Sequence, residues 1–319
     1  MNFTMSSDHG PSAIYDGHMH IGGSAEPNPE ELIRRLTACG ISGGNVISID
    51  PDDVNFTYEQ RVENLFAWVK GYEDRLFPVA WLHPGEPDVL EKVRDLAARG
   101  VAAFKFIPNT YFPGDEQPMR VFRLIEELNL PVIFHSGVLY DFLESSQYNK
   151  PLNWECFAKF KRLRFSMGHC GHPWYDECVL MYGKFRWMRW HAACAANGEA
   201  TINANNPWVL EHLSEAADGT RTFTTPQLFL DTTPGAHKAY RRDLLTKLVS
   251  CFPDGDGIFF GTDMYVEDYS EDVVKGWLAF ENEILDEAGA TQSFREKMYC
   301  GNLFSFLNLD KNASPRRDF

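Results

Sequence analysis

The feature that most constrains this sequence is an alternation, repeated eight times, between a short apolar run and a longer amphipathic segment. Each apolar run ends in a cluster of polar residues, Gly or Pro, and several runs are apolar at nearly every position. Continuously apolar strands are buried on both faces, which is typical of parallel sheets covered by helices. The predicted strands lie at residues 12–18, 44–49, 76–82, 101–107, 131–136, 164–169, 227–232 and 257–262.

Segments suited to amphipathic helices fill most of the intervals between these strands. Residues 28–39 carry the clearest signals, because Pro29 and acidic residues stand in the first turn while Leu32 and Leu36 share one face. Further helices are expected at residues 56–73, 86–99, 115–129, 153–162, 173–183, 207–217, 237–251 and 270–288, with one or two capping helices within 291–309.

Eight strand–helix units in register predict an α/β fold of the (β/α)8 (TIM) barrel type, in one domain that spans residues 1–319. The chain is long enough, because such barrels need about 250 residues. An open doubly wound sheet is the alternative, but it usually has fewer strands and a Gly-rich turn after the first one. The GSAEP that follows the first strand is not that turn. The ordered core is expected at about 10–309, with a frayed tail at 310–319.

One interval is too long for a single crossover and predicts an insertion after the sixth strand. Residues 170–226 hold the two helices expected at 173–183 and 207–217, and between them a segment rich in Trp, Asn and Ala. Long insertions that follow barrel strands lie over the active face and shape the pocket. Substrate specificity is therefore expected to depend on residues 183–206.

Charge and composition exclude several classes of protein. The chain has 30 Lys and Arg against 45 Asp and Glu, a formal net charge of −15, which argues against a nucleic-acid partner. No apolar stretch approaches the ~20 residues that span a membrane, and the N-terminus lacks the pattern of a secretory signal. Seven cysteines without CxxC spacing favour reduced thiols and a cytoplasmic location.

Four histidines and one aspartate lie at or just beyond the C-terminal ends of predicted strands, where active sites of these barrels form. They are His18, His20, His135, His169 and Asp263. His18 and His20 are two apart on a strand and therefore face the same side. Imidazole and carboxylate groups suit a borderline metal such as zinc. Each residue alone also fits a hydrogen-bonded core or a helix cap, but their joint placement favours a metal site.

With these residues placed, the chain resembles the amidohydrolase superfamily. The branch it resembles contains aminocarboxymuconate-semialdehyde decarboxylase and related metal-dependent hydrolases. The resemblance rests on five segments that span nearly the whole chain: DGHMHIG (16–22), PVIFHSG (131–137), FSMGHCGHP (165–173), FGTDM (260–264) and the closing YCGNLFSFLNL (299–309).

The resemblance implies roles for individual residues. His18, His20 and His135 are implied as ligands of one divalent metal, with zinc expected first and manganese second. Asp263 is implied as a fourth ligand that also acts as general base on metal-activated water. His169 is implied as the strand-six histidine, which stabilises developing negative charge on the substrate or ligates a second metal.

Lys105, at the end of the fourth predicted strand, leaves three interpretations open. As a carboxylated lysine it would bridge two metals, as a cation it would bind a substrate carboxylate, and otherwise its role is structural. The second is preferred. His172, Trp174 and His83 are further candidates for substrate binding, because each lies near the end of a predicted strand.

We expect a hydrolase that directs metal-activated water at a C–N or C–O bond of a small, carboxylate-bearing substrate. Non-oxidative decarboxylation in the same site is the alternative, because the two reactions share their ligands. A barrel that has lost catalysis and serves only for binding is a second alternative, disfavoured by the complete ligand set. A homodimer is expected from the resemblance alone.

Overall fold

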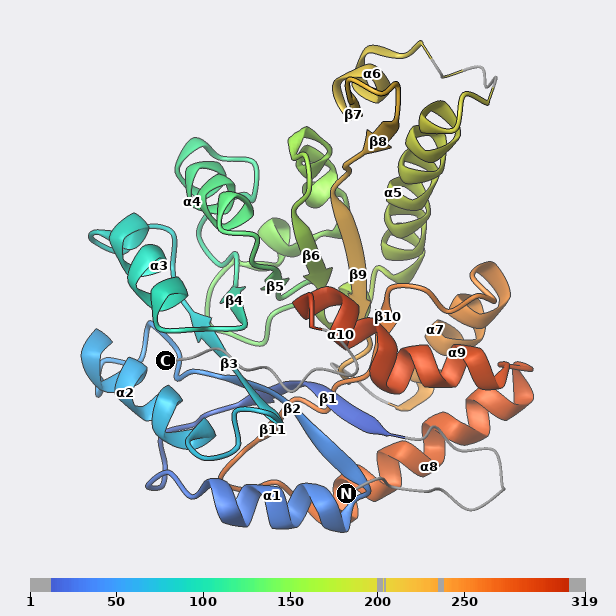
Figure 1. Cartoon of the computed structure of the whole chain (residues 1–319). Helices are drawn as coiled ribbons and strands as arrows, with labels where there is room; N and C mark the ends of the chain where they lie inside the picture. The colour runs from blue at the N-terminus through green and yellow to red at the C-terminus, as the bar shows by residue number, and fades with distance from the viewer. Residues whose placement is uncertain (1–12, 200–202, 204, 235–237, 310–319) are drawn as a thin grey trace.

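Nine strands form one parallel sheet that curls into a barrel, with helices packed around its outside (Figure 1). The computed structural model describes residues 13–199, 203, 205–234 and 238–309. The strand order is β10-β9-β6-β5-β4-β3-β2-β1-β11. The strands are β1 (Ile14–His20), β2 (Ile41–Ile47), β3 (Leu76–Trp81), β4 (Ala103–Phe106), β5 (Val132–Phe134), β6 (Arg164–Met167), β9 (Gln227–Asp231), β10 (Ile258–Phe259) and β11 (Met264–Tyr265).

The eighth strand closes the barrel, although it is broken into two short pieces. β10 pairs with β9 on one side, and β11 pairs with β1 on the other. Between the pieces, the amide of Gly17 donates to the carbonyl of Phe260 at 2.8 Å, and the amide of Asp263 donates to the carbonyl of His18 at 2.9 Å. The predicted (β/α)8 barrel is therefore confirmed, although the eighth strand is shorter than the expected 257–262.

Most helices lie close to their expected positions. They are α1 (Pro29–Ala38), α2 (Tyr58–Val69), α3 (Val89–Ala98), α4 (Glu116–Glu127), α5 (Tyr175–Ala196), α6 (Pro207–Glu211), α7 (Lys238–Cys251), α8 (Glu271–Glu287), α9 (Gln292–Glu296) and α10 (Asn302–Leu307). The segment expected as a helix at 153–162 is instead a 3-10 helix, η2 (Pro151–Lys159), and a π-helical turn, η4 (Lys297–Gly301), joins α9 to α10.

The insertion after β6 differs from its prediction at both ends. α5 continues through Gly183 to Ala196, because buried residues recur at helical spacing past the glycine and outweigh its cost of about 1 kcal/mol. The second expected helix ends at Glu211, after which β7 (Leu213–Glu215) and β8 (Arg221–Phe223) form an antiparallel hairpin. The turn of this hairpin holds Asp218-Gly219, a turn dipeptide that the helical interpretation overlooked. This hairpin, α6 and the end of α5 project from the barrel (Figure 1).

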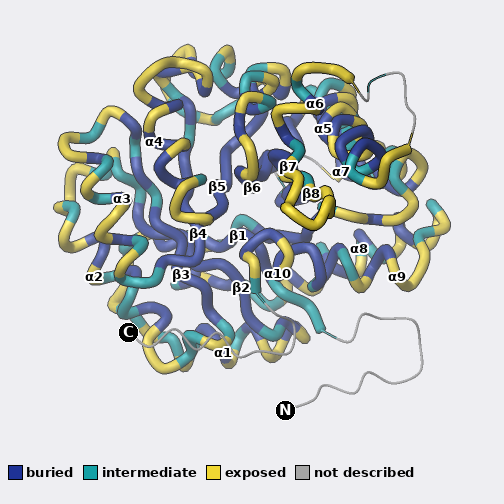
Figure 2. The backbone as a smooth tube through the Cα atoms, turned by 45° about the horizontal axis from the view of Figure 1, so that its top comes forward, coloured by how far each residue is buried: buried dark blue, intermediate teal, exposed yellow. Residues whose placement is uncertain are grey.

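One apolar core lies on each side of the sheet. Figure 2 shows the buried strands surrounded by helices whose outer faces are exposed. The outer core joins the strands to the helices and includes a cluster of aromatic rings from Phe106, Phe122, Phe134 and Phe157. The inner core fills the barrel with side chains such as Phe77, and α10 adds Phe304, Phe306 and flanking leucines to it. The C-terminal helix thus packs against the barrel interior.

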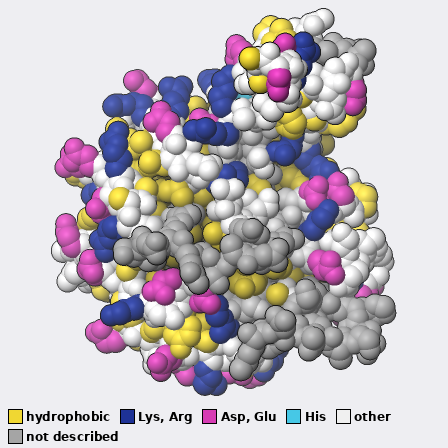
Figure 3. Space-filling model, in the orientation of Figure 1, with side chains coloured by type: hydrophobic (Ala, Val, Ile, Leu, Met, Phe, Trp, Pro, Cys, Tyr) yellow, Lys and Arg dark blue, Asp and Glu magenta, His cyan; other side chains and the backbone are white. Residues whose placement is uncertain are grey.

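The distribution of surface charge and the state of the cysteines are consistent with what the composition suggests. On the face in Figure 3, acidic and basic side chains are interspersed, so the net charge of −15 does not gather there in one patch. All seven cysteines are free thiols. Within the described ranges, no helix combines the length and apolarity that a membrane span requires. The tail expected at 310–319 lies outside the described residues.

Phe122 is fully buried in the aromatic cluster, with ring centroids 5.1–5.4 Å from those of Phe106, Phe134 and Phe157. Phe122→Ala should lower the free energy of unfolding by about 3–5 kcal/mol, because it removes these contacts and leaves a cavity. Urea denaturation measures the change. Phe142→Ala, at a fully exposed phenylalanine, is the control and should cost less than about 0.5 kcal/mol. Equal losses in the two variants would contradict this description of the core.

Candidate metal centre

Most of the predicted metal-site residues line one cavity at the carboxyl ends of the strands, and His18 lies completely buried beside His20. His18 and His20 end β1, His135 follows β5, His169 lies in the 3-10 segment η3 (Gly168–Gly171) after β6, and Asp263 lies between β10 and β11. The cavity has a volume of about 480 Å³. Its lining includes His20, Asp50, Asp53, Trp81, Lys105, His135, Tyr140, His169, His172, Asp263 and Tyr265.

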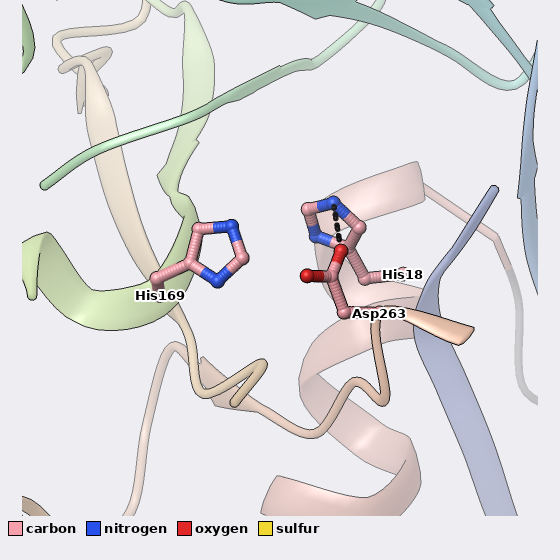
Figure 4. Close-up of side chains that lie close together, drawn as sticks. All are labelled: His18, His169 and Asp263. Carbon is pink, nitrogen blue, oxygen red and sulfur yellow. Dashed lines mark ion pairs between the residues drawn. The ribbon is translucent and has the colours of Figure 1, made fainter. Parts of the chain in front are cut away.

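Three of these side chains point their ligand atoms at a common position. The Nε2 atoms of His18 and His20 are 3.1 Å apart, and the Asp263 Oδ1 atom lies 3.7 Å from the first and 3.4 Å from the second. His169 joins them, because one ligand atom from each of His18, His169 and Asp263 lies within 4.8 Å of the others (Figure 4). The resemblance left two roles for His169, stabilising negative charge on the substrate or ligating a second metal, and its position beside His18 and Asp263 is compatible with both.

His18 is held by a carboxylate that the sequence analysis did not single out. Its Nδ1 atom pairs with the carboxylate of Asp231, and both side chains are completely buried. The other oxygen of Asp231 accepts hydrogen bonds from the amide and hydroxyl of Thr233. A proton on Nδ1 leaves the Nε2 lone pair free for a metal, which is how a second carboxylate usually orients a ligating histidine. Asp231 lies near the end of the seventh predicted strand, and this position was the signal that could have identified it as a site residue.

Two site residues take a backbone conformation that L-residues seldom adopt. His169 has a φ of 55° and Asp263 a φ of 64°. Such left-handed residues cost of order 1–3 kcal/mol and occur where a structure needs a side chain turned out of a regular strand. This is why β6 ends at Met167 rather than at the expected residue 169. Gly261 makes room for the turn, since a Cβ there would lie 2.8 Å from the Cβ of His18.

Asp16 fixes the turn that carries Asp263. Its completely buried carboxylate accepts from the amide of His18 at 3.0 Å, the amide of Thr262 at 3.0 Å and the hydroxyl of Tyr269 at 2.9 Å. The Thr262 hydroxyl donates to it as well. One side chain thus connects β1 to the broken eighth strand and holds both sources of ligands in register.

Burial sets the protonation states of the cluster. Loss of solvation lowers the pKa of His18 and His20, lowers that of His169 to about 4, and holds that of His135 well below the ordinary value. Burial alone would raise the pKa of Asp263, but the neighbouring imidazoles hold it well below its usual range. Neutral imidazoles and an ionised carboxylate are the forms that bind a metal.

Lys105 lies inside the cluster rather than beside it. Its side chain is 1% exposed, and its Nζ atom is 3.2 Å from the Nε2 atom of His18. Burial lowers its pKa to about 8, while Asp231 and Asp263 favour the charged form. The lysine is therefore mostly an ammonium at neutral pH, and it approaches the same lone pair that a metal would use.

The residues expected to bind substrate do not all reach the cavity. His172 lines it, and its Nδ1 atom is 2.8 Å from the hydroxyl of Tyr175. In the part of the chain that the structure describes, neither Trp174 nor His83 belongs to the lining: Trp174 lies under the ammonium of Lys150, and His83 is 3.3 Å from the Thr110 hydroxyl. Their substrate-binding roles stay predictions.

The aromatic walls of the cavity are Trp81 and Tyr265, which flank His20 with ring centroids at 5.5 and 6.3 Å. Asp50, Asp53 and Tyr140 also line the cavity and were not predicted from the sequence. They lie in loops after β2 and β5, and only the rule that such loops surround the site could have indicated them.

The donor set fits a divalent metal. The ligand atoms around a tetrahedral zinc are about 3.4 Å apart when each bond is about 2.1 Å, and the separations within the set of His18, His20 and Asp263 are 3.1–3.7 Å. Two more buried nitrogens, His135 Nε2 and His169 Nδ1, have no hydrogen-bond partner among the described residues. A buried polar atom without a partner is costly, and a ligand in the cavity would satisfy it.

Solved structures with the same architecture are numerous but distant in sequence. A probable 2-pyrone-4,6-dicarboxylic acid hydrolase from Acinetobacter baumannii, with citric acid bound, is 11% identical with a TM-score of 0.55, covering 93% of this chain and 99% of that one. The 5-carboxyvanillate decarboxylase from Novosphingobium aromaticivorans, complexed with manganese and a nitrobenzoic acid, is 12% identical with a TM-score of 0.54, covering 97% and 99%. The 2,6-dihydroxybenzoate decarboxylase from Rhizobium is 12% identical with a TM-score of 0.54, covering 93% and 98%.

These structures confirm the barrel fold. No curated protein matches the sequence significantly. The amidohydrolase family model, however, matches residues 16–302, from Asp16 beside the first metal-ligand candidates to Asn302 at the start of α10. That match covers most of the chain, and members of this family are metal-dependent enzymes. The chain therefore belongs to the amidohydrolase family, and it is an enzyme.

Proposed function

We propose that this enzyme is a metal-dependent hydrolase that acts on a C–N or C–O bond of a small, carboxylate-bearing substrate. The observation that supports this most directly is the position of Asp263. Its carboxylate lies 3.4 Å from His20 Nε2, lines the cavity, and is held ionised by the imidazoles around it. An ionised carboxylate so placed suits a general base.

We propose His18, His20, His135 and Asp263 as the ligands of one divalent ion, with zinc or manganese as its identity. A divalent metal held there would acidify a water molecule and polarise an oxygen of the substrate. His169, neutral because its pKa is about 4, keeps one ring N–H that can donate to an oxygen as it gains negative charge. Asp263 accepts the proton of the attacking water.

Lys105 is proposed to bind the substrate carboxylate. Its ammonium lines the cavity, and no Asp or Glu of the described ranges lies within 4.0 Å of it. A carboxylated lysine that bridges two metals is the alternative, and metal stoichiometry distinguishes the two: one ion per chain supports the cation, two support the bridge.

Decarboxylation is a second candidate, because two of the similar structures are decarboxylases and a shared ligand set serves both reactions. A panel of lactones, esters, amides and hydroxybenzoates, followed by product analysis and by CO₂ release, separates them. We expect hydrolysis products without CO₂, and Asp263→Asn should lower kcat by about 100- to 10,000-fold. CO₂ as the main product would replace the hydrolase by the decarboxylase. Asp268→Asn, at an exposed carboxylate, should leave the rate unchanged.

Metal content tests the ligand set independently of any substrate. The purified enzyme should hold about one divalent ion per chain, and the double variant His18→Ala/His20→Ala should hold none, because two of the proposed ligands are removed. Elemental analysis by mass spectrometry gives the stoichiometry, and circular dichroism verifies that the variant is folded. His83→Ala, outside the cavity lining, is the matched control and should keep its metal. Metal retained in the double variant would contradict the proposal.

Asp231→Asn tests the outer carboxylate. The amide keeps the shape of the side chain but loses the charge that orients His18, so metal affinity should fall by about 10- to 100-fold. Competition with a chromogenic chelator measures this affinity. Unchanged affinity would mean that Asp231 serves the barrel core rather than the metal centre.

A further inference from the structure

The cavity is lined by side chains of opposite charge that are buried to different depths. Lys105, only 1% exposed, lies at the floor beside His18. Asp50 and Asp53 line the same cavity from the loop after β2, and both are partly exposed, so they lie nearer the mouth. Of the lysines and arginines in the described ranges, Lys105 alone lines this cavity.

Within the described ranges, neither mouth carboxylate forms an ion pair, although the charge of Arg61 reaches Asp50 from a greater distance. One oxygen of each is used within the loop: Asp50 Oδ1 accepts from the amide of Asp52, and Asp53 Oδ1 accepts from the amide and side chain of Asn55. Over the described residues, no Lys or Arg nitrogen comes within 4.0 Å of either carboxylate. Each therefore keeps an oxygen and a negative charge that a ligand in the cavity would meet.

Unpartnered buried nitrogens in the cavity support its role as a binding site. His135, 7% exposed, lines it with a buried Nε2 atom that has no hydrogen-bond partner in the described chain, and the same holds for Nδ1 of His169. Trp81 and Tyr265 also line the cavity, where they flank His20 and offer flat apolar surface to a ring or chain. A ligand in the cavity therefore meets a cation at the floor, and aromatic faces and anions nearer the mouth.

The charges of Lys105, Asp50 and Asp53 determine which ligands fit the cavity. A carboxylate at the floor is attracted by Lys105, whereas a second carboxylate nearer the mouth would face Asp50 and Asp53, neither of which forms an ion pair in the described chain. An ammonium or a hydroxyl at that position would instead donate to the free oxygens of Asp50 and Asp53.

We propose that the substrate bears a single carboxylate and, at its opposite end, an ammonium or hydroxyl donor that Asp50 and Asp53 recognise. This inference rests on the proposed function, because it takes the metal end of the cavity as the reacting end. It names the two aspartates as specificity-determining residues and excludes dicarboxylates with charges at both ends.

Three rigid probes of similar shape test the proposal: benzoate, 4-(aminomethyl)benzoate and terephthalate, which differ only in the group opposite the carboxylate. Isothermal titration of the manganese-loaded enzyme measures their affinities at constant salt. We expect 4-(aminomethyl)benzoate to bind at least about tenfold more tightly than terephthalate, with benzoate between them. In Asp50→Asn/Asp53→Asn the ratio of the affinity for 4-(aminomethyl)benzoate to that for terephthalate should fall by about tenfold or more. The affinity for benzoate should stay constant.

The asparagine variants keep the oxygens that the loop uses, so the fold is preserved. Asp52→Asn is the matched control, because it removes a charge from the same loop without lining the cavity, and its ratio should stay close to that of the wild type. The proposal is wrong if terephthalate binds the wild type as tightly as 4-(aminomethyl)benzoate, if the double variant leaves the ratio unchanged, or if 4-(aminomethyl)benzoate does not bind.

Failure of the proposed function gives a different result. If the purified enzyme binds no divalent metal at the four proposed ligands, no water can be activated in the cavity and the proposed function loses its support. The charge preference between 4-(aminomethyl)benzoate and terephthalate remains measurable in that case and still tests the roles of Asp50 and Asp53.

Discussion

Closure of the barrel between its first and eighth strands is the constraint on which the rest of the site depends. His18 and Asp263 are 245 positions apart in the chain, yet the amide of one donates to the carbonyl of the other at 2.9 Å. The eighth strand breaks where it meets β1, and the break turns Asp263 toward the cavity with a φ of 64°. A regular strand there would pair more completely but would leave the carboxylate without this orientation.

Buried charge follows from that closure. The first and eighth strands bring Asp16 and Asp263 close to His18, the neighbouring strand β9 contributes Asp231, and Lys105 adds a cation to the same volume. Burying several charged side chains together costs free energy unless each of them is paired or hydrogen-bonded. Asp16 is satisfied by donors from β1 and the eighth strand, and Asp231 by His18 and Thr233. The imidazole nitrogens of His135 and His169 stay unsatisfied in the described chain, which makes this end of the barrel a place for ligands rather than for stability.

The barrel was predictable from the sequence because each unit carries its own local signals. Continuous apolar runs mark buried parallel strands, and Pro and acidic residues mark helix starts, as in α1. The errors lie where long-range packing overrides local preference. Gly183 looked like a helix end, but a buried stripe on both sides carries α5 through it. The hairpin after α6 depends on Asp218-Gly219, a two-residue signal within a segment of otherwise helical composition.

The site was partly predictable for a related reason. Residues at strand ends converge in any barrel of this class, so His18, His20, His135, His169 and Asp263 could be grouped from spacing alone. Asp231 occupies an equivalent position but was not recognised, since a single aspartate in LFLDT resembles an ordinary strand end. Loop residues such as Asp50 have no periodicity that indicates which way their side chains face. The distribution of charge in the cavity was therefore not predictable from the sequence.

The central claim is that these strand ends hold a metal, and anomalous diffraction tests it most directly. Crystals grown with manganese, with data collected on both sides of its absorption edge, would show where the ion binds without reference to any substrate. We predict one strong anomalous peak bonded to His18 Nε2, His20 Nε2, a ring nitrogen of His135 and a carboxylate oxygen of Asp263. A map without a peak between these side chains, or with the ion bound elsewhere on the acidic surface, would contradict it.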